Sequence, residues 1–109
     1  MLYIKKIAGS VNGVYIGTTR KDPSSERGHP SNSLISNFCK NYGVVPQFST
    51  LMIIPTYKIN PIYGETYLIN CVEECAPQII LLNSLRPHGG AFGYDKESKN
   101  IVDKLLKLI

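Results

Sequence analysis

The sequence predicts a mixed α/β (α+β) domain in which helices flank a small, mainly antiparallel β-sheet. Two short β-prone runs open the chain with an Asn-Gly dipeptide between them, which is the strongest short-range signal for a hairpin. Helical and β-prone segments then alternate to the end, and 109 residues with 43% hydrophobic residues suffice for one core. We therefore expect a single domain over residues 1–109, in the order strand, strand, helix, strand, helix, strand, helix.

The opening hairpin comprises residues 2–7 and 14–18. Its second strand carries Tyr15 and reaches Gly17 and two threonines, so this strand should end in an open, hydroxyl-rich turn. A lone tyrosine in a strand usually packs in a core. The position of Tyr15 beside a turn is therefore not by itself a sign of function.

The first helix follows a polar loop that we expect over residues 20–32, where two prolines and a glycine interrupt any periodicity. Ser31 or Ser33 can cap this helix, which should run through Lys40, and Gly43 is placed to stop it. The side chains expected on its buried side are Leu34, Ile35, Phe38 and Cys39.

The middle of the chain predicts a strand and then a second helix. The strand covers residues 47–54, and its continuous apolar end suggests a central position in the sheet. Asn60 as N-cap and Pro61 at the first helical position start the helix, and Pro77 must end it. Glu65 stands in its first turn, where the helix dipole alone favours a carboxylate. The expected apolar stripe comprises Ile62, Ile69, Val72 and Cys75.

The last third of the chain predicts a short buried strand, a loose turn and a final helix. These segments cover residues 79–82, 88–93 and 96–109. The lysines of the final helix should lie on its outer face, where they either remain solvated or contact a DNA backbone.

The charge balance permits an anionic partner without requiring one. Twelve Lys and Arg against eight Asp and Glu give a formal net charge of +4. No apolar run approaches the roughly 20 residues that span a bilayer, and no secretory leader precedes the first strand. We expect a soluble intracellular protein without membrane partners, either cytoplasmic or, if it is viral in a eukaryotic host, nuclear.

The chain has three cysteines, and this odd number argues against the disulfide framework of a secreted protein. Cys71 and Cys75 are one helical turn apart and could recruit His88 to hold zinc. Two such cysteines without a second pair are more often core thiols. We therefore favour the core interpretation.

Several segments together resemble the GIY-YIG nuclease family. Tyr15-Ile16-Gly17 matches the second half of the family name, and Met1-Leu2-Tyr3 matches the first half, one residue farther upstream than is usual. Arg27, the segment "HPSNSLISNFCKNYG" that begins at His29, "ETYLIN" from Glu65, and the pair Leu82-Asn83 follow in the family's order. The stretch "GGAFGYDKESKNIVDKL" is similar to the start of a modular DNA-binding motif that often follows such domains.

The resemblance implies a metal-dependent endonuclease that hydrolyses DNA phosphodiester bonds. By that resemblance Glu65 holds one Mg²⁺ or Mn²⁺ ion, which acts as a Lewis acid and keeps several waters. Arg27 grips the phosphate oxygens, and Tyr15 or Tyr3, aided by His29, takes the proton of the attacking water. Asn83 orients a neighbour by hydrogen bonding.

The chain departs from the family between Arg27 and His29, where only Gly28 stands. The family usually has a helical turn or more there, so Arg27 falls on a loop and Arg20 could substitute for it. A phenol is a poor base at its ordinary pKa, so cationic neighbours must lower the pKa of the tyrosine. Lys5, Arg20 and Arg27 are the candidates for this role.

DNA is the expected partner, and basic residues are expected to contact it. Selectivity could come from a homodimer. A second function stays open, namely a nucleic-acid-binding module that keeps the fold and has lost catalysis. His29 could be an ordinary loop histidine, and Asn83 could simply close a turn. The basic residues expected to contact nucleic acid are Lys5, Arg20, Lys21, Lys96 and Lys99.

Overall fold

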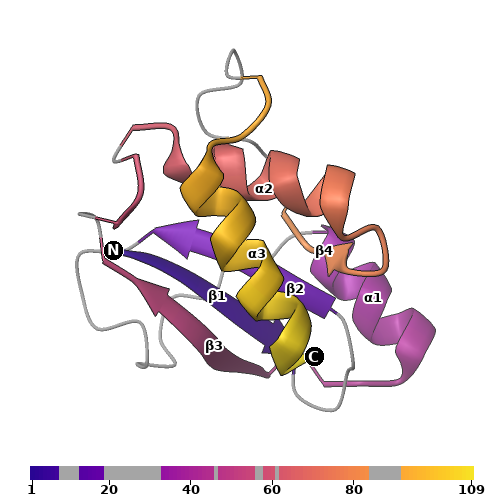
Figure 1. Cartoon of the computed structure of the whole chain (residues 1–109). Coiled ribbons are helices and arrows are strands. Elements are labelled where there is room, and N and C mark those ends of the chain that lie inside the picture. Colours follow the sequence, from indigo (N-terminus) through magenta and orange to yellow (C-terminus); the bar gives the residue numbers. More distant parts are fainter. Residues whose placement is uncertain (8–12, 19–32, 46, 56–57, 61, 84–91) are drawn as a thin grey trace.

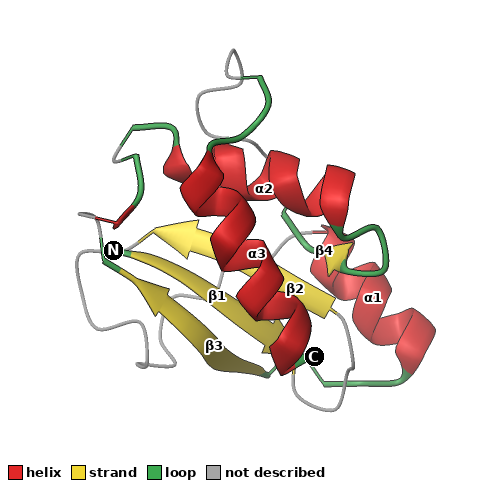
Figure 2. Cartoon of the chain, in the orientation of Figure 1, coloured by secondary structure: helices red, strands yellow, loops and turns green. Residues whose placement is uncertain are grey.

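The structure is a computed structural model that describes residues 1–7, 13–18, 33–45, 47–55, 58–60, 62–83 and 92–109. Its described elements are four strands and three helices in the predicted order (Figures 1 and 2). The α+β class is therefore confirmed. The strands are β1 (Leu2–Ile7), β2 (Gly13–Thr18), β3 (Phe48–Ile54) and β4 (Ile80–Leu81), and the helices are α1 (Ser33–Tyr42), α2 (Gly64–Cys75) and α3 (Lys96–Leu108).

The four strands form one mixed sheet in the order β3-β1-β2-β4. β1 pairs antiparallel with both β2 and β3, whereas β2 pairs parallel with β4. The prediction that the strand around residues 47–54 is central was wrong, because β3 lies at the edge and β1 at the centre. An apolar run indicates that the faces of a strand are buried but does not indicate how many strands pair with its edges. In β3, Ile54, Leu51 and Met52 pack in the core with residues of α2 and α3 although β3 has one partner strand among those described.

Side-chain alternation divides the sheet into two faces. Leu2 and Ile4 of β1 belong to a core that contains buried residues of α2 and α3. Ile7, on the opposite face of the same strand, belongs to a second core with Ile35 and Phe38 of α1. In Figure 1, α3 crosses over the sheet, with α2 along the β2 side. The odd-numbered residues of β1 and β2 therefore share the face that α1 covers.

The helix boundaries follow the predicted signals, with two corrections. The regular part of α2 begins at Gly64, after a turn in which Asn60 Oδ1 accepts hydrogen bonds from the backbone N–H groups of Ile62 (2.8 Å) and Tyr63 (2.7 Å). Asn60 thus caps this turn rather than the helix, and Ile62 is 58% exposed instead of buried. In α1, Leu34 is likewise exposed. No described helix has the length and apolar character needed to cross a membrane.

The helix ends agree with the predictions. α2 stops at Cys75, two residues before Pro77, and α1 stops at Tyr42, before Gly43 with φ of 63°. α3 begins after Asp95, whose Oδ1 accepts a hydrogen bond from Ser98 N (2.9 Å). These caps fix the ends of the helices that surround the sheet.

Candidate active site

Tyr3 and Tyr15 lie on the same face of two adjacent strands. In the antiparallel register Tyr3 is opposite Gly17 and Tyr15 is opposite Lys5, so all four residues point to the α1 side. The two phenol rings are 6.4 Å apart between centroids and tilted by 36°. This spacing is within the usual range of aromatic pairs. The hairpin therefore brings the two tyrosines of the sequence prediction together.

Gly17 allows this arrangement because the Tyr3 ring lies directly over its backbone. A Cβ at Gly17 would be 2.5 Å from Cζ of Tyr3 and 3.0 Å from Cε1 of Tyr15. At the shorter of these separations, either the Tyr3 ring or the strand has to shift. Gly17 is therefore required for the close approach of Tyr3 to β2.

Lys5 contributes a positive charge to this face. It is only 4% exposed, and its Nζ lies 5.2 Å from the centroid of the Tyr3 ring, which is a cation–π distance. Lys5 thus lies beside the tyrosines rather than on an open surface. Its predicted contact with nucleic acid remains a prediction.

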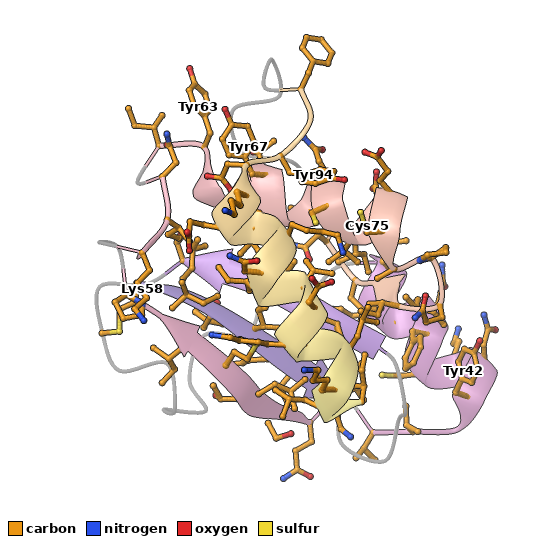
Figure 3. The ribbon with its side chains drawn as sticks, viewed as in Figure 1. Tyr42, Lys58, Tyr63, Tyr67, Cys75 and Tyr94 are labelled. Atoms are coloured by element: carbon orange, nitrogen blue, oxygen red, sulfur yellow. The ribbon has the colours of Figure 1, made fainter. Side chains whose placement is uncertain are left out.

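Glu65 approaches the same two tyrosines from the first turn of α2. Tyr63 and Tyr67, whose rings are 5.9 Å apart, lie at this end of α2 and point away from the sheet (Figure 3). Glu65 is two residues from each of them, so it projects from the opposite side of the helix. Its charge raises the pKa of both Tyr3 and Tyr15, which requires the carboxylate to lie within electrostatic range of both hydroxyls.

The pKa of Glu65 itself is strongly perturbed. Burial raises the pKa of its carboxyl from the ordinary 4.5 to about 7. The carboxylate is thus an incompletely solvated negative charge at neutral pH. Such a group gains from a bound cation, and a single carboxylate with retained waters is an ordinary way for proteins to hold Mg²⁺.

The tyrosines do not have the lowered pKa that the sequence argument required. Burial, followed by the neighbouring Tyr3 and then Glu65, raises the pKa of Tyr15 to about 12. Burial and Glu65 also raise the pKa of Tyr3. The described surroundings therefore keep both phenols protonated at neutral pH, although Lys5 is close to the Tyr3 ring.

Asn83 bonds the backbone of the strand that carries Tyr15. Its Oδ1 accepts a hydrogen bond from Ile16 N (3.0 Å) and its Nδ2 donates one to Ile16 O (2.7 Å). Leu82 N donates to Val14 O (2.8 Å), so the side chain of Asn83 continues the pairing of β4 with β2 by one further step. This amide–peptide pair fixes β2 between Tyr15 and Gly17.

Several predicted site residues cannot be compared with the structure. Arg20, Lys21, Arg27 and His29 lie outside the described residues, as does His88 of the zinc alternative. Within the described part, no group of three His, Cys, Asp or Glu side chains could hold a metal ion.

Other predicted residues lie away from the tyrosines. The Nζ of Lys99 on α3 is 2.6 Å from Oδ1 of Asp103, and Lys96 is exposed at the start of the same helix. Cys71 is buried in the core, and Cys75 Sγ is 3.0 Å from the Tyr94 hydroxyl. The burial of Cys71 and the packing of half-buried Cys75 against the same core agree with the preferred interpretation of the two cysteines as core thiols.

Three relationships were not anticipated from the sequence: the Tyr3 ring over Gly17, the Lys5 ammonium over that ring, and the pairing of Asn83 with Ile16. The first two could have been found from strand alternation once the hairpin register was known.

No family model, no curated protein and no solved structure matches this chain.

Proposed function

We propose that this chain is a metal-dependent DNA endonuclease of the GIY-YIG type. The observation that carries the proposal is that Tyr3 and Tyr15 lie side by side on the hairpin and that Glu65, 62 positions after Tyr3, raises the pKa of both from the first turn of α2. Two phenols beside a partly desolvated carboxylate combine candidates for proton transfer with a candidate cation ligand.

The proposal gives separate roles to the site residues of the structure and to those that the family resemblance adds. Glu65 would hold a divalent cation, which when bound supplies positive charge for the developing negative charge of the phosphoryl group. Tyr15, or Tyr3 in its place, takes a proton from the attacking water, and Asn83 holds the strand that positions Tyr15. Arg27 or Arg20 grips the phosphate and His29 assists proton transfer, as the family resemblance implies.

The raised tyrosine pKa favours a second candidate function. A phenol with a pKa of about 12 is almost fully protonated at neutral pH and cannot accept a proton in that state. If substrate and cation do not lower this pKa, the chain is a nucleic-acid-binding module without catalysis. The net charge of +4 supports binding in either case, and DNA affinity should fall steeply with salt.

The decisive experiment incubates supercoiled plasmid with the purified chain and Mg²⁺ or Mn²⁺. The parent should nick or linearise the plasmid, and Glu65→Gln should not, because the amide keeps the size but removes the charge that holds the cation. DNA binding by Glu65→Gln should equal or exceed that of the parent, since a phosphate-repelling charge is gone.

A matched control changes a carboxylate of the same helix far from the tyrosines. Glu74 lies on the exposed side of α2, and Glu74→Gln should cut the plasmid at the rate of the parent. Equal cutting by Glu65→Gln and the parent would place the metal elsewhere or indicate a contaminant. If neither protein cuts duplex, branched or single-stranded DNA with either ion, the binding module becomes the better assignment. Analytical ultracentrifugation with and without DNA tests whether a homodimer provides selectivity.

A further inference from the structure

A groove of about 510 Å³ lies between the end of β3 and the solvent side of α3. The end of β3 and Pro55 after it form one wall, and α3 forms the other. Ile54 and Ile101 also line the groove, but both are buried in the same core and close it from below. An occupant of the groove therefore lies over these two side chains, between the residues of the rim.

Three exposed lysines stand on the rim, and they come from both walls. Lys104 and Lys107 are three residues apart on α3, so they lie on the same side of the helix. Lys58 comes from the opposite wall, where its backbone N–H donates a hydrogen bond to Pro55 O (3.0 Å) in the turn after β3 (Figure 3). Positive charge therefore faces an occupant from two sides.

Two carboxylates also line the groove, and they do not cancel this charge. Oδ1 of Asp103 is 2.6 Å from Nζ of Lys99, which offsets the charge of Asp103. Glu97 lies in the first turn of α3, about two turns before Lys104. The described lining of the groove thus has a net positive charge, which complements a polyanion.

Ile53 connects the groove to the candidate active site. It lines the groove and is 45% exposed, and in the antiparallel register it is opposite Tyr3 of β1. Residues that are directly opposite in such a pair point to the same face of the sheet, so the side chain of Ile53 lies beside Tyr3. The groove and the tyrosines thus meet at β3, where one extended polyanion can contact both.

A sugar-phosphate backbone fits this combination of features. Its phosphates match the lysines of the rim, and its deoxyribose groups can lie against the apolar Ile53 and Pro55. Two copies of the chain joined through this face would instead bring two positive rims together, which costs free energy. We infer that the groove between β3 and α3 is the docking surface for the backbone of duplex DNA, which passes over Ile53 towards Tyr3, an inference that rests on the proposed function.

The test measures the binding of a short fluorescent DNA duplex by anisotropy, in EDTA so that no cation supports cleavage. Lys58→Gln and Lys104→Gln should each raise the Kd about fivefold or more at about 0.1 M salt, because each removes one phosphate contact. Each should also lower the slope of log Kd against log salt by about 0.9. The matched control Lys40→Gln removes the same charge from the exposed end of α1 and should leave the Kd within about twofold.

A second pair of variants tests the path over β3. Ile53→Glu places a carboxylate between the groove and Tyr3 and should raise the Kd about fivefold or more, since it repels the phosphates. The control Val45→Glu introduces the same charge at a residue that is 62% exposed after α1, and it should leave the Kd within about twofold. Circular dichroism confirms that each variant is folded.

The outcomes separate this inference from the proposed function. Equal Kd values for Lys104→Gln and Lys40→Gln, or for Ile53→Glu and Val45→Glu, would overturn the docking surface even if the parent cuts plasmid. Weaker binding by the groove variants alone would support it even if the parent does not cut. The inference would also be overturned if a glutamate-rich peptide bound and Lys104→Gln weakened that binding, while the duplex did not bind.

Discussion

The phenol ring of Tyr3 lies over the backbone of Gly17, its antiparallel partner on the neighbouring strand. The absence of a side chain at Gly17 thus sets the position of Tyr3, and with it the spacing of 6.4 Å between the two tyrosine rings. Any residue larger than glycine must displace Tyr3 or bend β2. The hairpin therefore couples a backbone feature to the geometry of the candidate active site.

Gly17→Ala should destabilise the fold and disturb the site. The added methyl group would be 2.5 Å from Cζ of Tyr3, an overpacking that typically costs about 1–3 kcal/mol. Urea denaturation measures the free energy of unfolding. Combining Gly17→Ala with Tyr3→Ala removes the ring that the methyl group meets, so the double variant should lose less than the sum of the two single losses. Strict additivity would contradict the proposed collision.

Asn83→Ala should loosen β2 at Ile16. The variant leaves the backbone N–H and C=O of Ile16 without their amide partner, at a cost of about 1–3 kcal/mol. Hydrogen exchange of the Ile16 amide should become faster, as NMR can measure. The control Asn37→Ala removes an exposed amide on α1 and should change stability by no more than about 0.5 kcal/mol. Unchanged protection of the Ile16 amide against hydrogen exchange in Asn83→Ala would show that the two hydrogen bonds to Asn83 do not stabilise β2.

Glu65 should make stability depend on pH in a specific window. Its folded-state pKa of about 7 exceeds the ordinary 4.5, so the folded chain retains a proton that the unfolded chain has released. Its contribution to stability is therefore fully present below about pH 4.5, is lost as pH rises to about 7, and is constant above that.

Glu65→Gln should abolish this loss. The free energy of unfolding of the variant minus that of the parent should rise between pH 4.5 and 7 and then remain level, when both are measured in EDTA. Above that window, millimolar Mg²⁺ should raise the melting temperature of the parent but not of the variant. A flat difference across the window would mean that Glu65 is better solvated than its position in the fold implies.

The sequence predicted the existence of the hairpin but not its register. A two-residue turn at Asn12-Gly13 would pair Val11 with Val14, whereas Val14 is opposite Lys6 and Gly13 already belongs to β2. The dipeptide is a local signal, but register follows from which face of each strand is buried against the helices. The opposition of Tyr3 and Gly17 therefore required the three-dimensional structure.

The candidate site was partly predictable for a similar reason. Residue types and their order indicated Tyr3, Tyr15, Glu65 and Asn83. The raised pKa of both phenols was not predictable, because burial and mutual proximity depend on the hairpin register and on packing on the α1 face of the sheet, and the effect of Glu65 depends on where α2 places it. The edge position of β3 likewise depends on pairing choices that an apolar run does not encode.

Tyr15 provides the most direct test of the proposed chemistry. Tyr15→Phe keeps the ring and removes the group that would take the proton, so it should slow plasmid cleavage by about 100-fold or more while DNA binding persists. Because the pKa of Tyr15 is about 12, kcat/KM of the parent should still rise with pH above about 8, where Glu65, with a pKa of about 7, is mostly ionised. The expected slope is about tenfold per pH unit, and the variant should show none of it. A normal rate for Tyr15→Phe, with the rise in the parent kept, would exclude Tyr15 as the base and transfer the role to Tyr3. A plateau in the parent over this range would exclude both phenols, because the pKa of each is raised. The same profile measured with Tyr3→Phe then decides between the two phenols.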